Sequence, residues 1–398
     1  MTSFSVRFLG CKVSHVDAHD VRERLLADGH VESAEAEVAI VNTCCVTNEA
    51  VAKSRKEAAR AARSHKRVYV TGCGANLAAD AFAGLPENVV VVARRSEETP
   101  AFVAGDVGAI GCVQADARLD RVRAFVKVQD GCSFGCSFCV IPLVRGASRS
   151  RDADAVLTEI RRRVAQGHRE VVLTGINLGC YRDRGAGYDL PLLVRAAGAT
   201  PGLERLRLSS IEINHVSDAL IAALRETPTV SRHLHVPLQS GDDDVLRAMR
   251  RRYTVATFLR RLEPLHDEFN LTSDVIVGFP TEDERAFANT LATVREAGLT
   301  KVHVFPYSPR PGTATATADP VAPQVKKDRG LRLRDASHDA CLARWRTKVG
   351  RDDRVLVDRP GRGYGDDYSP WLVDAAAPIG ELVSVRGAGV SDEGVLAA

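Results

Sequence analysis

Short apolar runs alternate with stretches of helical periodicity from residue 5 to residue 92. The apolar runs predict strands at 5–9, 37–41, 67–71 and 89–92, and the stretches between them predict helices at 16–26, 48–63 and 74–83. Because strands that alternate with helices form parallel sheets covered by helices, this part is expected to be an open α/β domain. The rhythm is lost at residues 94–120, which are expected to form a linker.

A second series of strand-like runs begins near residue 123. Six runs, separated by helical stretches, lie at 124–128, 170–174, 205–209, 233–237, 272–277 and 301–305. Six βα units are too few for a complete eight-unit barrel, so they predict a partial (βα)6 barrel or a large doubly wound sheet. A loop at 308–322 and a basic helical segment to about 349 follow. Short apolar runs broken by Gly, Pro and Asp then predict a small β-barrel.

The predicted fold class is therefore α/β, with domains at 1–118, 119–345 and 346–398. Composition agrees, since 398 residues with 45% hydrophobic and 26% charged side chains are typical of a folded chain with more than one domain. The net charge is only +3, so the total charge gives no sign of a nucleic-acid partner.

Ten cysteines are the unusual feature of the composition. The first residues lack the apolar run of an export signal, and no stretch of about 18 apolar residues is present to span a membrane. A cytoplasmic chain with no membrane partner is therefore expected. Thiols stay reduced in that compartment, which favours metal binding or chemistry over disulfides.

Three cysteines form a compact motif directly after the first strand of the second series. Cys132, Cys136 and Cys139 have the spacing C-x-x-x-C-x-x-C, which supplies three thiolates to one soft metal centre. An iron–sulfur cube held by three cysteines leaves one iron open to another ligand. A structural zinc site is the alternative, but it needs a fourth ligand, and none is near in sequence. The spacing favours a 4Fe-4S cluster.

A second trio is dispersed along the N-terminal domain. Cys11, Cys44 and Cys73 each follow a predicted parallel strand, and such strand ends meet at one sheet edge, where ligands bind. The alternative is three small buried thiols that merely end strands. Three cysteines in register favour a second three-cysteine cluster. Cys45 adjoins Cys44, so either can supply the thiolate, and the strand register favours Cys44. The others, Cys112, Cys180 and Cys341, are expected to be structural or incidental.

The compact motif, with Phe138 before its last cysteine, resembles the radical S-adenosylmethionine (SAM) superfamily. With the dispersed trio, nearly the whole chain resembles the radical SAM methylthiotransferases, through the segments 9–13, 42–47, 72–76 and 141–151. The C-terminal piece stands in the place of the small RNA-binding TRAM barrel. Two segments depart from the family pattern: Ser14-His15 replaces a customary Asn-Gln, and 278–282 lacks the usual second Gly.

Within this family, four segments resemble the branch that acts on threonylcarbamoyladenosine in tRNA. They are 129–131, 173–179, 235–242 and 249–254. The branches that act on isopentenyladenosine in tRNA or on a ribosomal-protein aspartate differ at 175–179 and remain alternatives. An iron–sulfur RNA-binding or electron-transfer protein is a further alternative, although pure electron carriers normally use four cysteines per cluster.

The resemblance implies two 4Fe-4S clusters and SAM as cofactors. The cluster on Cys132, Cys136 and Cys139 would bind and cleave SAM, and the resulting radical would attack carbon 2 of adenosine 37. The cluster on the dispersed trio would hold a sulfur atom that a second SAM methylates. No catalytic residue is expected beyond the cluster ligands. The implied partners are a tRNA anticodon stem-loop and a reductant protein of the flavodoxin or ferredoxin type.

Other candidate contacts lie at strand ends and in basic runs. Five residues at the ends of core strands are expected to bind SAM, with turn formation as the alternative: Gly175, Asn177, Gln239, Ser240 and Asp274. The basic residues Arg145, Arg149, Arg151 and 250–252 are expected to contact RNA phosphates. In the C-terminal barrel Tyr364, Tyr368 and Trp371 either stack on bases or pack in a core. Acidic residues outnumber basic ones beyond residue 351, which is unfavourable for RNA binding.

Overall fold

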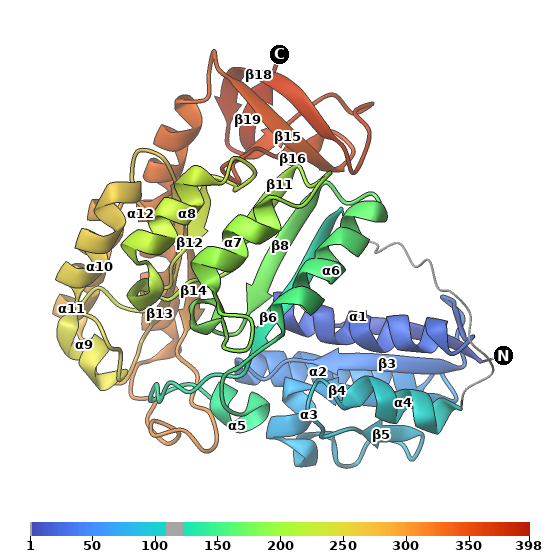
Figure 1. The fold of residues 1–398 in the computed structure, drawn as a ribbon. Helices are drawn as coiled ribbons and strands as arrows, with labels where there is room; N and C mark the ends of the chain where they lie inside the picture. Colours follow the sequence, from blue (N-terminus) through green and yellow to red (C-terminus); the bar gives the residue numbers. More distant parts are fainter. Residues whose placement is uncertain (1, 109–121) are drawn as a thin grey trace. The chain divides into compact units, whose positions relative to one another are not determined.

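The computed structural model describes residues 2–108 and 122–398, and Figure 1 labels their helices and strands. These residues form two compact units. Among the described residues, the first unit is drawn from 2–108, 130–148 and 308–317, and the second from 122–129, 149–307 and 318–398. The loop that carries Cys132, Cys136 and Cys139 therefore belongs to the first unit, together with the N-terminal sheet.

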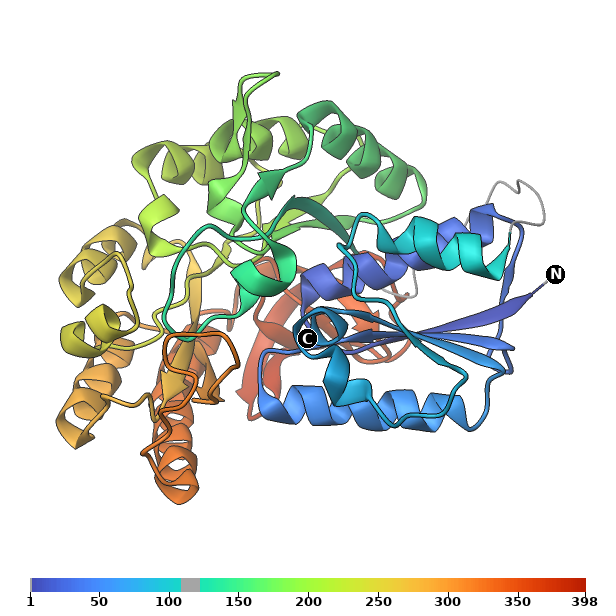
Figure 2. The ribbon, with the colours of Figure 1, turned by 90° about the horizontal axis from the view of Figure 1, so that it is seen from below.

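The first unit is built on a parallel sheet of five strands in the order β2-β1-β3-β4-β5. Their bounds are β1 Ser3–Phe8, β2 Val31–Glu32, β3 Val38–Thr43, β4 Arg67–Gly72 and β5 Val89–Val91. Helices α1 (Lys12–Ala27) and α4 (Thr99–Val107) lie on one face. Helices α2 (Asn48–Ala62) and α3 (Cys73–Leu77) and the 3-10 turn η1 (Ala79–Phe82) cover the other face (Figure 2). The predicted open α/β domain is confirmed.

Helix α4 corrects one expectation. The segment 94–120 was expected to be a linker, but Thr99–Val107 is a helix that packs Val103 and Ala104 against the sheet. Pro100 stands at its start, where a proline fits, and Gly108 ends it with a positive φ of 88°. The helix has only nine residues, too few for a clear periodic signal. Residues 109–121, which include Cys112, lie outside the described residues.

The second unit contains six parallel strands that form a partial barrel. They are β6 Arg123–Asp130, β8 Glu170–Gly175, β11 Arg205–Leu208, β12 His233–His235, β13 Asn270–Val277 and β14 Lys301–Pro306. Two sheets, β11-β8-β6-β7 and β12-β13-β14, are joined by a parallel bridge between Ser210 and His235. The additional strand β7 is Arg149–Ser150. The predicted partial barrel is confirmed.

Helices surround these strands on the outside (Figure 2). The helices of this unit are α6 Ala153–Ala165, α7 Leu190–Gly198, α8 Asp218–Glu226, α9 Asp243–Ala248, α10 Val255–Leu262, α11 Glu284–Glu296 and α12 Pro323–Arg346, with short 3-10 turns η2 Leu178–Cys180, η3 Ile213–His215 and η4 Glu263–Leu265 and a small hairpin of β9 Arg182–Asp183 and β10 Tyr188–Asp189. Several begin where a side chain accepts a hydrogen bond from the first turn, as Asp152, Ser217 and Asp283 do.

Alternation along the six strands gives the partial barrel a polar interior. Residues such as Val126, Leu173 and Val275 pack in the core beneath the helices. Their neighbours in sequence point to the opposite face, because strand side chains alternate with a period of two. That second set is polar: Lys127, Gln129, Thr174, Ser209, His235 and Asp274. The interior is therefore suited to a polar ligand.

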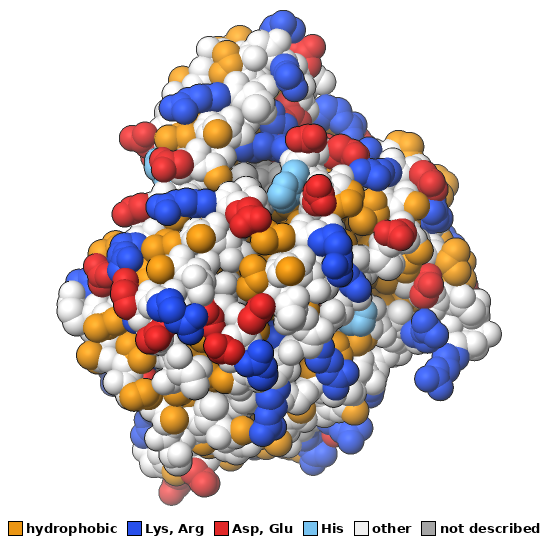
Figure 3. All heavy atoms as spheres, turned by 90° about the vertical axis from the view of Figure 1, so that its left-hand side faces the viewer, with side chains coloured by type: hydrophobic (Ala, Val, Ile, Leu, Met, Phe, Trp, Pro, Cys, Tyr) orange, Lys and Arg blue, Asp and Glu red, His pale blue; other side chains and the backbone are white. Residues whose placement is uncertain are grey.

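Basic and acidic side chains are interspersed on the face that carries α10 and α11, as Figure 3 shows. Arg332 of α12, for example, pairs with Glu284 at 2.7 Å and with Asp328 at 3.5 Å. Charges of both signs are therefore mixed on this face, in agreement with the low net charge of the chain.

The chain ends in a closed barrel of five strands in the order β15-β16-β17-β19-β18. The strands are β15 Asp352–Arg359, β16 Arg362–Tyr364, β17 Pro370–Leu372, β18 Leu382–Ser391 and β19 Gly394–Ala397. Trp371, Val355 and Val395 form its core with Trp345 of α12. The predicted small β-barrel is confirmed.

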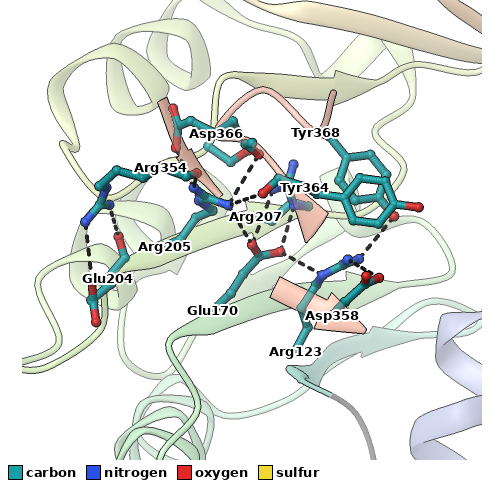
Figure 4. Close-up of polar contacts among 12 residues, drawn as sticks. Arg123, Glu170, Glu204, Arg205, Arg207, Arg354, Asp358, Tyr364, Asp366 and Tyr368 are labelled. Atoms are coloured by element: carbon teal, nitrogen blue, oxygen red, sulfur yellow. Dashed lines mark hydrogen bonds and ion pairs between the residues drawn. The ribbon is translucent and has the colours of Figure 1, made fainter. Parts of the chain in front are cut away.

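A buried ion network joins this barrel to the core strands of the same unit (Figure 4). Glu170 accepts hydrogen bonds from Arg207 at 2.9 Å and from Arg205 at 3.3 Å. Arg205 also donates to the carbonyl oxygens of Tyr364 and Gly365 in the barrel. Arg205 of a core strand thus holds the barrel through backbone carbonyl oxygens. These contacts do not depend on the side chains of the barrel residues.

Aromatic residues of the barrel belong to the same interface. The rings of Tyr364 and Tyr368 stack with centroids 4.6 Å apart, and the guanidinium of Arg123 lies over the Tyr364 ring at 4.7 Å. Trp371 is only 1% exposed. Of the two roles considered for these aromatic residues, packing is the one that the structure supports.

Candidate functional site

Cys11, Cys44 and Cys73 follow β1, β3 and β4, which are adjacent in the parallel sheet of the first unit. All three therefore stand at the carboxyl edge of that sheet. Cys11 is the N-cap residue of α1, and Cys73 is the first residue of α3. A helix N-terminus favours a thiolate, because the unpaired N–H groups there carry partial positive charge.

The loops that carry the trio are held close together by hydrogen bonds and by glycines. The hydroxyl of Thr43 donates to the Thr71 carbonyl at 2.6 Å and accepts from the backbone N–H of Ala75 at 3.1 Å. Gly72 has a φ of 87°, and a side chain there would lie 2.9 Å from the Thr43 carbonyl oxygen. The ends of β3 and β4 are thus locked in register, which fixes Cys44 relative to Cys73.

The thiols of the trio interact electrostatically. Burial raises the pKa of the Cys44 thiol, and negative charge on Cys73 and Cys11 raises it further. By contrast, a hydrogen bond from the Cys45 thiol and the positive charge of Arg145 lower the pKa of Cys73 to about 7. Cys73 therefore becomes a thiolate more readily than Cys44.

The structure distinguishes Cys44 from Cys45. Cys45 is completely buried in an apolar cluster with Val140 and Val144, and its carbonyl accepts a hydrogen bond from Arg310. Cys44 is half-buried, and its Cβ would lie 3.7 Å from a side chain added at Gly10, next to Cys11. Cys44 therefore lies next to the loop that carries Cys11, whereas Cys45 packs in the apolar cluster that also contains Cys73.

Alanine at Cys44 is expected to remove one cluster ligand, whereas alanine at Cys45 removes a packed thiol. After anaerobic reconstitution, Cys44→Ala should bind about four fewer iron atoms than the unsubstituted protein, the content of one 4Fe-4S cluster. Cys45→Ala should keep its iron and lose about 1 kcal/mol of stability, as small buried truncations do. Iron analysis and chemical denaturation measure the two effects, and the reverse pattern would identify Cys45 as the ligand.

The compact cysteine loop is also closed by backbone contacts. The Cys132 N–H donates to the Gly146 carbonyl at 3.0 Å, and the Ser148 N–H donates to the Ser133 hydroxyl at 3.1 Å. Gly131 has a φ of 67°, and a side chain there would lie only 2.2 Å from the Ala147 carbonyl oxygen. The segment 146–148 therefore clamps the start of the loop, and only glycine fits at position 131.

Arg145 is placed differently from its expected role. It was expected to contact RNA phosphates, but its side chain is only 5% exposed, so that expectation is wrong for this residue. Its Nε–H donates to the Cys73 sulfur at 3.1 Å, and its Nη atoms bind Asp130 and, at 2.7 Å, Asp17. Burial lowers the pKa of Arg145. The negative charges of Asp17, Cys73 and Asp130 outweigh this effect and raise that pKa well above its ordinary value.

The donor sets fit iron–sulfur clusters. Each set supplies thiolate sulfur, the ligand type of such clusters, and glycines give the surrounding loops close backbone approach. Among residues 2–108 and 122–398, no three His, Cys, Asp or Glu side chains lie close enough to hold a single metal ion. A cluster does not need that geometry, since each thiolate binds a different iron atom.

The residues expected to contact SAM lie in the second unit. Gly175 and Asn177 follow β8, and the Asn177 N–H donates to the Gln129 side chain at 2.8 Å. A side chain at Gly175 would lie 3.0 Å from the same Gln129 oxygen. The sequence pattern indicates Gln129 only as part of a motif, but its side chain shapes this turn. Its position three residues before Cys132, on the polar face of β6, is the signal that could have identified it.

Gln239, Ser240 and Asp274 differ in their surroundings. Gln239 has a positive φ of 64° and its N–H donates to the Asp274 carbonyl at 2.8 Å. Ser240 is completely buried, and its hydroxyl lies 3.4 Å from that of Thr290 and accepts a hydrogen bond from the Asp242 N–H at 3.3 Å, so it caps a turn. The Asp274 carboxylate faces the interior and pairs with His235 at 3.2 Å.

The two departures from the family pattern have local explanations. Ser14 lies 3.6 Å from the Cys11 sulfur, and the ring of His15 packs edge-on against Phe8 at 5.0 Å. In the segment 278–282, a carboxylate oxygen of Glu282 accepts a hydrogen bond from the Gly278 N–H at 2.8 Å. The first departure therefore changes the immediate surroundings of a predicted ligand, whereas the second stabilises a turn.

The remaining basic residues differ in their exposure. Arg151 binds Glu159 at 2.7 Å, and Arg251 pairs with Glu212. Arg250 and Arg252 are exposed, with Arg250 at a positive φ of 58°. In the described part of the chain, none of the helices has the length and apolar character needed to cross a bilayer.

Two family models match the chain. The radical SAM superfamily covers residues 126–294, and the family described as uncharacterized protein family UPF0004 covers residues 3–93. The first match contains the compact cysteine motif and the first five core strands. The second contains all three cysteines of the dispersed trio.

Curated relatives match over almost the full length. A protein of Thermotoga maritima named threonylcarbamoyladenosine tRNA methylthiotransferase MtaB is 31% identical, covering 100% of this chain and 96% of the relative. A tRNA-2-methylthio-N(6)-dimethylallyladenosine synthase of Paracoccus denitrificans is 32% identical, covering 96% and 93%. The radical SAM methyltransferase TsrM of Kitasatospora setae, solved with cobalamin and a [4Fe-4S] cluster, shares the fold, with a TM-score of 0.58 at 13% identity over 79% of this chain and 77% of that chain. The chain belongs to the family of radical SAM tRNA methylthiotransferases.

Proposed function

We propose that this enzyme methylthiolates carbon 2 of N6-threonylcarbamoyladenosine at position 37 of tRNA. The observation that carries the proposal is the presence of two three-cysteine sets in one compact unit, one in the spacing C-x-x-x-C-x-x-C and one at three adjacent strand ends. Membership of the family implies SAM and 4Fe-4S clusters as cofactors. We assign Cys132, Cys136 and Cys139 to one cluster and Cys11, Cys44 and Cys73 to the other.

When bound, these groups supply an electron that cleaves SAM and an open iron that holds sulfur. The chain's own residues orient them and keep water away. Gly175, Asn177, Gln239 and Asp274 are proposed to contact SAM, because they line the polar interior at the carboxyl ends of the core strands. Ser240 would contribute through its backbone, since its hydroxyl is bonded elsewhere.

The choice of base rests on the four segments that resemble the threonylcarbamoyladenosine branch, two of which contact each other in the structure. Gln129 belongs to one, Gly175 and Asn177 belong to the other, and these residues are in contact. This supports treating both segments as one specificity feature. The branch that acts on isopentenyladenosine, which is also called dimethylallyladenosine, is the second candidate. The synthase named for that base is 32% identical to this chain, and the relative named MtaB is 31% identical.

The partners follow from the same proposal. The anticodon stem-loop is the proposed RNA substrate, with the exposed Arg250 and Arg252 among its phosphate contacts. A flavodoxin or ferredoxin type of protein would supply the electrons. We place the reaction in the cytoplasm, where tRNA is modified and used.

Analysis of tRNA nucleosides tests the substrate. A strain that lacks this gene should lose 2-methylthio-threonylcarbamoyladenosine and accumulate threonylcarbamoyladenosine, because the last step is missing. The unsubstituted gene should restore the product, and Cys73→Ala should not. Loss of the methylthio group from isopentenyladenosine instead would establish the other branch. An unchanged nucleoside profile would argue against a tRNA substrate.

A further inference from the structure

A single buried guanidinium connects the two cysteine sets. Arg145 follows the compact cysteine loop at the end of α5 (Ile141–Arg145), and its Nε–H donates to the sulfur of Cys73 at 3.1 Å. Its Nη1 binds both carboxylate oxygens of Asp130, at 3.1 and 3.2 Å. Its Nη2 binds Asp17 at 2.7 Å and Ser14 at 3.5 Å. All these residues belong to the first unit.

The charges explain why an arginine stands here. A buried cation is costly unless it is paired, and the two carboxylates supply two negative charges. Those carboxylates occupy the Nη atoms, at the outer end of the guanidinium, and leave the Nε–H for the sulfur. The planar fork of arginine presents donors on three separate nitrogens in fixed directions, whereas the donors of a lysine ammonium all lie on one nitrogen. The two aspartates therefore account for the buried charge of Arg145, but they do not account for its hydrogen bond to the Cys73 sulfur.

The guanidinium of Arg145, which contacts the Cys73 sulfur, also binds Asp130 at the start of the compact loop. Asp130 is the last residue of β6, and its carboxylate also accepts a hydrogen bond from the Gly131 N–H at 2.7 Å. Asp17 lies in α1, the helix that begins after Cys11. Arg145 therefore touches the start of the compact loop, the helix after one dispersed cysteine and the sulfur of another.

We propose that Arg145 is a positioning residue that tunes the cluster of Cys11, Cys44 and Cys73. Its hydrogen bond orients Cys73, and its positive charge beside the sulfur raises the reduction potential of that cluster. Hydrogen bonds to ligand sulfurs and nearby charge are established determinants of such potentials. The inference rests on the ligand assignment of the proposed function and adds a residue outside it.

Two substitutions are expected to shift the potential in opposite directions. Arg145→Gln removes a cation and the Nε–H donor, so the reduced cluster is less stabilised and its potential becomes more negative. Asp17→Asn removes an anion and leaves Arg145 in place, so the potential becomes less negative. A residue with only a structural role would weaken folding in both variants without producing shifts of opposite sign.

The measurement is an anaerobic redox titration of the full chain followed by electron paramagnetic resonance. The cluster in question is isolated in a background with Cys132, Cys136 and Cys139 replaced by alanine, which should retain about four iron atoms. Arg60→Gln is the matched control, because it removes the same charge from an exposed position of α2 in the same unit. Its potential should equal that of the background protein.

The outcomes separate this inference from the proposed function. If the triple-alanine background binds no iron, the ligand assignment is wrong. If the cluster forms and both substitutions leave its potential unchanged, or shift it in the same direction, the assignment stands and the role of Arg145 is refuted. If Arg145→Gln does not load a cluster, Asp17→Asn decides, and an unshifted potential there refutes the role.

Discussion

Glutamine in place of Glu170 is expected to destabilise the protein by about 3–5 kcal/mol, the cost of removing one partner from a buried ion pair. Glu170 is completely buried, and its carboxylate is shared by Arg207, Arg205 and Arg123. The amide has no negative charge to offset these cations. Because Arg205 also holds carbonyl oxygens of the C-terminal barrel, the barrel interface should weaken at the same time.

Fluorescence can follow this loss at the relevant place. The chain has two tryptophans, and both Trp345 and Trp371 lie in the core beneath and within the barrel. Chemical denaturation monitored by tryptophan emission should show a midpoint shift for Glu170→Gln. The control is Glu204→Gln, a half-buried carboxylate that pairs with Arg354, where about 1 kcal/mol or less is expected. Equal stability of the two variants would contradict the buried network.

The same carboxylate predicts a pH dependence. Burial alone would raise its pKa, but Arg207, Arg123 and Arg205 lower the pKa of Glu170 to about 2. A group with a lowered pKa in the folded state stabilises that state above its ordinary pKa of 4.5 and loses this contribution as the pH falls toward 2. Glu170→Gln should therefore lose less stability than the unsubstituted protein between pH 4.5 and 2. A parallel decline of both proteins would show that folding does not lower the pKa of Glu170.

The pattern of apolar residues was sufficient for the fold because most elements are long enough to show their period. All six residues of β3 are buried, and the first four form a continuous apolar run in the sequence. Helix α4 was missed because nine residues after a charged stretch give little periodic signal. Charged residues inside strands, such as Glu170 and Arg205, carry no local sign that they are buried and share a network.

The candidate site divides in the same way. The spacing of Cys132, Cys136 and Cys139 is local, and the register of Cys11, Cys44 and Cys73 follows from the parallel order of β1, β3 and β4. The surroundings of Arg145 could not be predicted, since Asp17 lies 128 positions away in the chain. Such a contact depends on how the chain returns to the sheet, which no local pattern encodes.

Loss of Cys73 should separate SAM cleavage from methylthio transfer. In Cys73→Ala the compact trio remains, so 5′-deoxyadenosine should still form with reductant. Transfer of the methylthio group should fall by more than about 100-fold, because even the loss of an outer partner of a metal ligand costs about 10–100-fold. Cys136→Ala should abolish both products, since it removes a ligand of the cluster that cleaves SAM.

Cys341→Ala is the control, because it removes a half-buried thiol next to Trp345 and leaves both trios intact. Chromatography of deoxyadenosine and mass spectrometry of the RNA nucleosides measure the two products in one reaction. Cys11→Ala serves as a second variant if Cys73→Ala folds poorly, since Cys11 is exposed and its removal leaves the packing unchanged. Methylthio transfer that survives both substitutions would contradict the second cluster. Loss of SAM cleavage in both variants would mean that the compact trio does not cleave SAM independently of the dispersed trio.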